Sequence, residues 1–450
     1  MHDITQVIGG GYCVGCGACV TQASNYIVIA ENECQQYQAK ILDGVNSKAL
    51  SVASSVCPFS NIGLNENELS DLFFEKSTGS EDDIIGYYQS LYAGHVTDND
   101  FRGKTTSGGI ISWTLNQLLK LSMVDAVIHV HKSAKEKTLF EYGISFTSDK
   151  VMSGAKSRYY PVEMSKVIDF VCNNEGRYAF VGLPCYVKAL RKLSISNPTI
   201  KERVKYCIGL VCGHLKSKAF ADLIGWEAGI VPGKLVDIDF RYKLTNRPAD
   251  NYGIRVVDDT GKSTVLIARE TFGTNWGHGF FKYKSCDYCD DIFSETADLS
   301  VGDAWMKPYT EDSKGNSLIV VRNAQIEKLI KAGIKTEELN LNILTPDEMR
   351  KAQGGGFRHR RIALGYRLYI KQKNNEWVPR KRVQANRNSI STSRKLVDIF
   401  RIYLREKSAE YWKQCHLSGN YSNFQHQMYM PSKAYDILLK IAAFGKRLKG

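Results

Sequence analysis

Short apolar runs alternate with helix-spaced apolar positions over much of the chain, beginning at YYQSLYAGHV. Residues 110–121, IISWTLNQLLKL, carry apolar side chains at helical intervals, and VDAVIHV after them has the length and branching of a buried strand. RYAFVGLPC and VKYCIGLVC predict two more strands with a helix, YVKALRKL, between them, and ADLSVGDAW and SLIVVR are further strand candidates. Strands separated by crossover helices are typical of an α/β domain with a mixed or parallel sheet.

The pattern changes on both sides of this region. Residues 1–61 are rich in cysteine and end in SSVCPFS. Residues 62–88, with NENELSDLFFEKSTGSEDD at their centre, are polar and acidic, which predicts a linker with one short helix. The composition shifts again near the glycines at 354–356. We therefore expect a cysteine module (1–61), a linker (62–88), an α/β domain (89–350) and a basic, mainly helical C-terminal region (351–450).

The positive charge belongs to that last region. The chain has a net charge of +13, but residues 351–450 alone hold 22 Lys and Arg against 5 Asp and Glu. PSKAYDILLKIAAFGKRLKG combines an apolar stripe at helical spacing with basic residues, which predicts peripheral contact with an anionic membrane or an acidic partner. A terminal helix packed on its own domain is the alternative. No recognised nucleic-acid motif is present, so nucleic acid is not expected as a partner.

Two further features bear on the compartment. No apolar run approaches the roughly 18 residues of a membrane span, and the start MHDITQVIGG lacks the regions of a secretory signal. We expect a cytoplasmic protein, peripheral at the inner membrane if the basic tail binds lipid. In that compartment the 12 cysteines indicate metal ligands or buried thiols rather than disulfides.

The N-terminal CVGCGACV places three of these cysteines at x2 spacing, which lets one tight loop offer three thiolates to a 4Fe-4S cluster. A fourth ligand must come from elsewhere, and Cys57 before Pro58 is the candidate. Glycines at 15 and 17 suit a loop that wraps a cluster. The predicted ligands are Cys13, Cys16, Cys19 and Cys57. Zinc or plain structural thiols are the alternatives.

A second group is predicted from strand ends. Cys185 and Cys212 each follow a predicted strand, and adjacent parallel strands would bring these ends together. Cys185 also precedes a helix, whose N-terminal dipole favours a thiolate. Cys286 and Cys289 in YKSCDYCDD supply another C-x2-C pair, enough for a second 4Fe-4S cluster. Alternatively, the strand-end cysteines are core thiols and the C-x2-C pair binds zinc.

Taken in order, several segments resemble the coenzyme F420 hydrogenase/dehydrogenase beta subunits, a flavin and iron–sulfur family that includes plant hydroxymethyl-chlorophyll reductase. The resemblance covers roughly residues 10–320. It is carried by CVGCGAC with CPF, RGKTTSGGIISWTL, AKSRYYPV, VGLPCYVKALRKL, LVCGH, DFRYK, CDYCDD and ADLSVGDAW. It implies a ferredoxin-like iron–sulfur module over 1–61, and an FAD held on the α/β domain near one or two 4Fe-4S clusters.

Several residues suit that flavin. TTSGG lies directly before a helix, whose N-terminus could bind a pyrophosphate. Without the resemblance, an ordinary Ser cap with flexible glycines is the favoured interpretation. AKSRYYPV offers cations and hydroxyls for phosphate or for the flavin ring edge, or is simply a solvated basic loop. The candidates are Arg102, Lys104, Thr106, Ser107, Gly108, Gly109, Lys156, Ser157, Arg158, Tyr159, Gly182 and Pro184. No GxGxxG follows a strand, so a Rossmann dinucleotide site is not indicated.

The function expected from the resemblance is an oxidoreductase that passes electrons between a two-electron donor and a substrate through FAD and 4Fe-4S clusters. Ferredoxin, NAD(P)H and F420 are the donors considered, since the family name does not settle the coenzyme. Some relatives occur beside polysaccharide genes, so the substrate could be a small molecule or a glycan precursor. No catalytic residue is identified. A flavin-free electron carrier and a zinc-stapled binding protein remain the alternatives.

Overall fold

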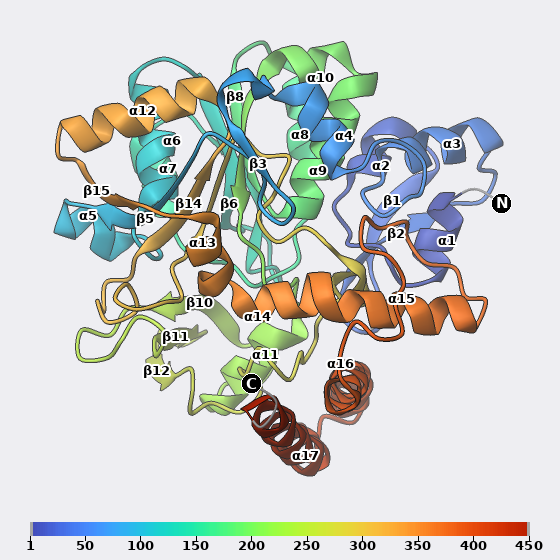
Figure 1. Cartoon of the computed structure of the whole chain (residues 1–450). Helices are drawn as coiled ribbons and strands as arrows, with labels where there is room; N and C mark the ends of the chain where they lie inside the picture. Colours follow the sequence, from blue (N-terminus) through green and yellow to red (C-terminus); the bar gives the residue numbers. More distant parts are fainter. Residues whose placement is uncertain (1–2, 448–450) are drawn as a thin grey trace.

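The apolar runs pair into one eight-stranded sheet in the computed structural model, which describes the backbone of residues 3–447 and the side chains of residues 3–443 (Figure 1). The strand order is β15-β5-β14-β13-β9-β8-β6-β7. β6, β8, β9 and β13 run parallel, and the outer pairs are antiparallel. The strands are β5 (Ser90–Val96), β6 (Ala126–Lys132), β7 (Phe140–Ser145), β8 (Tyr178–Gly182), β9 (Val204–Leu210), β13 (Leu299–Asp303), β14 (Ser317–Val321) and β15 (Leu339–Ile343). The predicted mixed α/β class is confirmed.

Helices cover both faces of this sheet (Figure 1). The helix predicted over residues 110–121 is α6 (Ile110–Lys120), and with α12 (Ala324–Lys335) it buries Trp113 and Leu118 against strand residues such as Ile208. The opposite face is covered by α8 (Ser165–Asn173), α9 (Pro184–Ser196) and α10 (Pro198–Arg203). The short helices α5 (Asn99–Lys104) and α7 (Ser148–Ser153) flank α6. α9 is the helix predicted between the strands that precede Cys185 and Cys212.

The N-terminal residues form α1 (Asp3–Gly9), α2 (Ala18–Ala23), the antiparallel hairpin β1 (Ile27–Glu31) and β2 (Tyr37–Ile41), and α3 (Ser47–Val56). Residues 62–88 contain the predicted short helix, α4 (Glu66–Phe73), which begins with an Asn65 and Glu68 capping box. After it come η1 (Lys76–Thr78) and the hairpin β3 (Ser80–Asp82) and β4 (Gly86–Tyr88). Glu66 is buried and accepts from Lys188 Nζ on α9 at 2.9 Å, so this segment is packed on the core.

A smaller sheet lies below the large one, with β10 (Leu235–Tyr242), β11 (Gly253–Asp258) and β12 (Ser263–Ile267) next to α11 (Ala219–Glu227) (Figure 1). η2 (Lys284–Tyr288) follows, before β13. The C-terminal region is mainly helical, as expected. It contains α13 (Pro346–Ala352), α14 (Gly354–Phe357), the π-helical turn η3 (Arg358–Ile362), α15 (Ala363–Lys373), α16 (Thr392–Ser418) and α17 (Ser422–Arg447).

α16 and α17 form a helical hairpin, in which the Phe424 and Trp412 rings meet edge to face at 5.1 Å. One side of α17 is therefore packed on the protein itself, whereas Met430, Ile437 and Ile441 are exposed on it. Residues 448–450 of the predicted basic terminal segment lie outside the described residues. Within residues 3–447, no helix has the length and apolar character needed to cross a membrane.

Candidate functional site

The four cysteines predicted as the first ligand set share one site. Cys13 and Cys16 lie on the loop between α1 and α2, Cys19 lies on the first turn of α2, and Cys57 follows the last residue of α3. All four line the same small cavity. Burial raises the pKa of the Cys13 thiol to about 11, and the neighbouring Cys57 adds to that rise. Cys57 thus meets three thiols that lie 38 to 44 positions earlier in the sequence.

The loop around these thiols is tight and offers backbone amides to sulfur. The N–H groups of Gly15 and Ala39 donate to Cys13 Sγ at 3.4 and 3.3 Å. Gly15 and Gly17 have φ of +65° and +87°, as expected for this loop. A Cβ on Gly15 would lie 2.3 Å from the carbonyl oxygen of Tyr37, so only glycine fits there.

The second group of cysteines also comes together. Cys185 is the second residue of α9, Cys212 lies just beyond β9, and Cys286 and Cys289 lie in and after η2. Burial raises the pKa of Cys185 well above its ordinary value, and the three other thiols add to that rise. β8 and β9 are adjacent and parallel, as the strand-end argument required. Among the side chains of residues 3–443, no three from Cys, His, Asp or Glu are grouped so that they could hold one metal ion.

Arg360 of η3 completes the surroundings of this second group. Its Nη1 donates to Cys289 Sγ at 3.3 Å, and its Nη2 donates to Cys212 Sγ at 3.6 Å and to Gly213 O at 2.7 Å. Burial acts to lower its pKa, but the nearby thiols of Cys289, Cys212 and Cys286 outweigh burial and raise that pKa above the ordinary value. No sequence pattern indicates this contact, because Arg360 lies 71 residues after Cys289 in a basic region.

Helix α9 joins the two cysteine groups. It carries Cys185 on its first turn, and the electrostatic influence of Cys16 reaches that thiol. Further along the helix, Lys192 Nζ donates to the carbonyl oxygen of Cys57 at 2.8 Å. Tyr186, next to Cys185 on this helix, donates to Val162 O at 2.6 Å. Burial raises its pKa, and the thiols of Cys185 and Cys16 add to that rise. The two sites are therefore close neighbours in the core.

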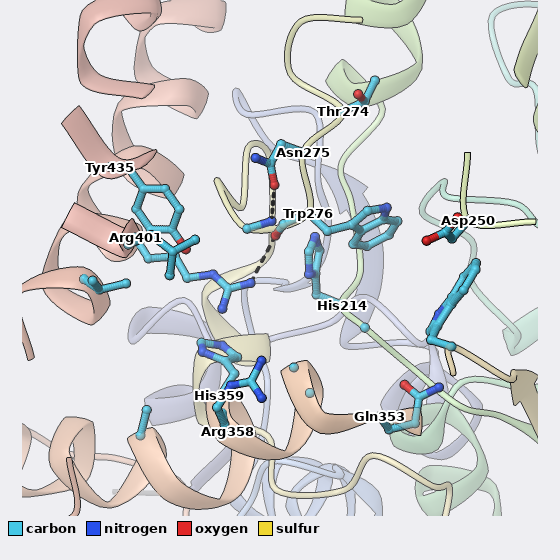
Figure 2. A pocket seen from close by; sticks show the side chains of 18 of the residues that line it. His214, Asp250, Thr274, Asn275, Trp276, Gln353, Arg358, His359, Arg401 and Tyr435 are labelled. Atoms are coloured by element: carbon cyan, nitrogen blue, oxygen red, sulfur yellow. Dashed lines mark hydrogen bonds between the residues drawn. The ribbon is translucent and has the colours of Figure 1, made fainter. Parts of the chain in front are cut away.

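A cleft of about 1400 Å³ opens beside the second cysteine group. His214, two residues after Cys212, lines it and contacts Trp276 with the ring centroids 4.3 Å apart and the rings tilted by 53°. His214 is 7% exposed, and its Nε2 has no hydrogen-bond partner within the described chain. Figure 2 shows His214 and Trp276 facing Arg358, His359 and Arg401 from the C-terminal region. His214 belongs to the LVCGH segment, but only Cys212 of that segment was predicted as a site residue.

Arg241 of β10 forms part of the same cleft wall. Its guanidinium pairs with Asp303 through two bonds of 2.9 and 3.0 Å. It lies over the rings of Tyr252 and Trp305, at 4.1 and 4.8 Å from their centroids. This cation is therefore held in one orientation at the wall.

Two segments predicted to hold flavin meet nearby, because Ser157 N–H donates to Thr106 Oγ1 at 2.9 Å. Thr106 and Ser107 line a small pocket that shares Arg241 and Tyr252 with the large cleft. Lys243 also lines this pocket, and its Nζ donates to Ser107 O at 2.8 Å. Burial, together with nearby arginines and Lys156, lowers the pKa of Lys243 to about 7.

The remaining charged and aromatic flavin candidates do not share one pocket. Tyr159 lines the large cleft. Lys156 pairs with Asp239 at 3.2 Å, and Arg158 lies over the Phe140 ring at 4.6 Å. Arg102 is buried and bound to Asp312 and Gly315 O, whereas Lys104 is exposed.

The four remaining positions are governed by backbone packing. A Cβ on Gly108 would lie 2.4 Å from Gly94 O, and Gly109 caps α6 with φ +82°. A Cβ on Gly182 would meet the Phe180 ring at 2.6 Å, and Pro184 is the first residue of α9. These positions let β5, β8 and the helices approach closely.

Two family models match the chain. The coenzyme F420 hydrogenase/dehydrogenase beta subunit N-terminal model matches residues 91–169, and the corresponding C-terminal model matches residues 175–347. Residues after 347 lie outside both matches.

Individual proteins are similar at low identity. The coenzyme F420-dependent sulfite reductase of Methanocaldococcus jannaschii is 21% identical over 360 residues, which cover 75% of this chain and 49% of that protein. This chain thus spans about half the length of that relative. The coenzyme F420 hydrogenase subunit beta of Methanococcus voltae is 24% identical over 282 residues, covering 58% of this chain and 88% of the relative.

A solved structure is similar in fold. A chain of the F420-reducing [NiFe] hydrogenase complex from Methanosarcina barkeri superposes with a TM-score of 0.50 at 17% identity, covering 66% of this chain and 98% of that one. The two adjacent family matches together cover more than half of the chain, and they show that it belongs to the coenzyme F420 hydrogenase/dehydrogenase beta subunit family.

Proposed function

We propose that the protein is an iron–sulfur flavoprotein oxidoreductase, with 4Fe-4S clusters at Cys13, Cys16, Cys19 and Cys57 and at Cys185, Cys212, Cys286 and Cys289. The observation that carries the proposal is the meeting of eight cysteines in two groups of four, the second beside a large cleft. The donor sets fit the clusters, because all eight candidate ligands are thiols and backbone amides donate to sulfur in each group.

The cleft fits a flavin and a second molecule. Its volume of about 1400 Å³ exceeds the roughly 300–1000 Å³ of most small-molecule sites. Its aromatic walls suit a planar ring, and the fixed Arg241 suits an anionic group of the cofactor. Arg241 Nε and His214 Nε2 are buried without partners among residues 3–447, so polar atoms are available to a ligand. The pocket at Thr106, Ser107 and Lys243 adjoins this wall, but its space of about 10 Å³ admits little more than one water molecule, so it would contact only the edge of a cofactor bound in the cleft.

The chain's own residues give each part a role. The flavin would supply the exchange between hydride transfer and single-electron transfer. Arg360 would offset negative charge at the second cluster, and the short span along α9 would keep both clusters within electron-transfer reach. The aromatic wall formed by Trp276 and Tyr159 would exclude water from the reacting ring.

The donor and substrate belong to the same proposal. F420 is the first donor to test, because the names of both relatives contain it. NAD(P)H and ferredoxin follow. A glycan precursor handled at the inner membrane would suit the exposed apolar side chains and lysines of α17.

The test is a cofactor analysis of anaerobically purified protein. We expect about eight iron and eight acid-labile sulfide per chain, with one flavin. Flavin peaks should lie over a broad absorbance shoulder in the visible spectrum. Iron and sulfide without flavin would instead identify an electron carrier. A colourless, zinc-loaded sample would identify the zinc-stapled binding protein and refute the proposal.

The reduction assay then ranks the donors. F420H2, NADH, NADPH and reduced ferredoxin are each added anaerobically to the loaded protein, and flavin bleaching is followed. Reduction by one of them supports the enzyme assignment, and reduction by none contradicts it.

A further inference from the structure

One wall of the large cleft is made by the C-terminal region, which lies outside both family matches. Arg358 comes from η3, Arg394 and Arg401 from α16, and Tyr435 from α17. In Figure 2, Arg358 and Tyr435 lie away from Trp276, and Arg401 is hydrogen-bonded to the Trp276 backbone. Any ligand that this wall binds is therefore recognised by residues outside the part of the chain that the family models match.

The charges on the cleft lining are unbalanced. Its three carboxylates already have arginine partners: Asp303 binds Arg241, Asp250 binds Arg269, and Asp398 binds Arg367. Arg358, Arg394 and Arg401 form no ion pair within residues 3–447. Three guanidinium groups thus border the cavity without an ion pair, although Arg401 lies close enough to the Asp398 carboxylate to interact with its charge.

These arginines are also close enough to affect one another. Burial and the neighbouring charge of Arg394 lower the pKa of Arg358. Arg401 Nη2 donates to Trp276 O at 3.0 Å, which leaves its Nε buried without a partner in the described chain. Cations gathered in this way cost free energy unless an anion binds among them.

The start of α16 adds backbone donors to the same corner. Ser391 caps this 27-residue helix and lines the cleft, and the first turn contains no acidic residue. The first amides of a helix have no intrahelical acceptor and favour an anion, most often a phosphate. The unpartnered, nine-tenths buried His214 faces the cavity from the other side and offers an independent polar contact.

We propose that this corner binds a phosphate or diphosphate group, so that the substrate is a phosphorylated small molecule whose uncharged part lies against Trp276 and His214. Arg358, Arg394 and the N-terminus of α16 would hold the anion, and Arg401 would support Trp276 through its backbone. This inference rests on the proposed oxidoreductase function, and it adds the chemical class of the substrate.

Inorganic pyrophosphate is the probe, titrated calorimetrically into anaerobic, cofactor-loaded protein. The wild type should bind it, more weakly as salt is raised. Arg358→Gln combined with Arg394→Gln should weaken binding about tenfold or more, as expected for lost charge-assisted hydrogen bonds. Arg387→Gln combined with Lys433→Gln is the matched control, because it removes two exposed charges outside the cleft lining and should leave binding unchanged. Equal affinity in both double variants would overturn the inference.

Two further readouts separate this site from the cofactor site. Flavin and iron per chain should be the same in the double variant as in the wild type. Loss of flavin would mean that the arginines hold the cofactor, which overturns the inference and leaves the proposed function standing. If the glutamine variant misfolds, Arg358→Lys with Arg394→Lys keeps both charges and should retain pyrophosphate binding; failure of that folded variant to bind would also overturn it. A wild-type sample without flavin or iron would refute the proposed function separately.

Discussion

Arg360 donates a hydrogen bond from Nη1 to Cys289 Sγ at 3.3 Å, so a cation from the C-terminal region lies directly against the second cysteine group. If that group holds a cluster, the charge and hydrogen bonds of Arg360 stabilise its reduced, more negative state. Arg360→Gln should therefore lower one midpoint potential by about 60 mV, equivalent to about 1.4 kcal/mol for one electron. A redox titration monitored by electron paramagnetic resonance measures it. Arg360→Lys keeps the charge and should shift the potential less, whereas equal potentials in all three proteins would contradict this role.

The two cysteine groups should load independently. Cys57→Ser should cost about four iron per chain, and Cys212→Ser should cost a different set of about four, because each removes one ligand of a separate group. Iron and sulfide analysis of anaerobic samples gives the counts. Cys34→Ser is the matched control, since this half-buried thiol belongs to neither group and should leave the iron content unchanged. Loss of all iron in each ligand variant would show that the groups do not load separately.

Asp298 should be important for stability rather than for cofactor content. Its Oδ2 accepts from Arg191 Nη2 at 2.8 Å and from Cys207 N–H at 2.7 Å, and all of these groups are buried. Asp298→Ala leaves the Arg191 charge uncompensated in the core and should lower the free energy of unfolding by about 3–5 kcal/mol. Urea denaturation followed by circular dichroism measures the change. Asp259→Ala removes an exposed partner of Lys234 and should cost less than about 0.5 kcal/mol.

Asp222 should make stability depend on pH near neutrality. Burial raises the pKa of this carboxyl to about 6, above the ordinary value of about 3.9. Between these values the folded state binds a proton that the unfolded state lacks, so stability falls as pH rises through 6. Asp222→Asn should therefore increase the free energy of unfolding by about 1 kcal/mol at pH 8, allowing for partial solvent screening, and by less at pH 5. Urea midpoints measured at both pH values test this, and a gain that is larger at pH 5 would contradict it.

Much of the fold and both cysteine groups could be predicted from local sequence. The helix over residues 110–121, the strands before Cys185 and Cys212 and the x2 spacing of Cys13, Cys16 and Cys19 all depend on residues within one or two turns or strands of each other. Periodicity and spacing record such relationships directly. The proximity of the two strand ends followed from one further rule, that a crossover helix joins neighbouring parallel strands.

Other contacts between residues could not be predicted from any local sequence pattern. Gly108 suggested a phosphate loop, but its backbone is packed against Gly94 and Ser317 of two strands. The glycines at 354–356 form a helical turn beside the cleft, a position that no local pattern indicates. At Gly108 the contact with distant strands requires glycine, because a Cβ would have no room there.

The sequence by itself determined which elements form and which thiols are available, because hydrophobic period and ligand spacing act over short stretches of chain. The tertiary structure alone decided that Arg360 would touch Cys289 and that Arg358, Arg394 and His214 would border one cleft. Those contacts depend on how the C-terminal helices pack against the carboxyl ends of the parallel strands, and burial of apolar surface from the whole chain fixes that packing.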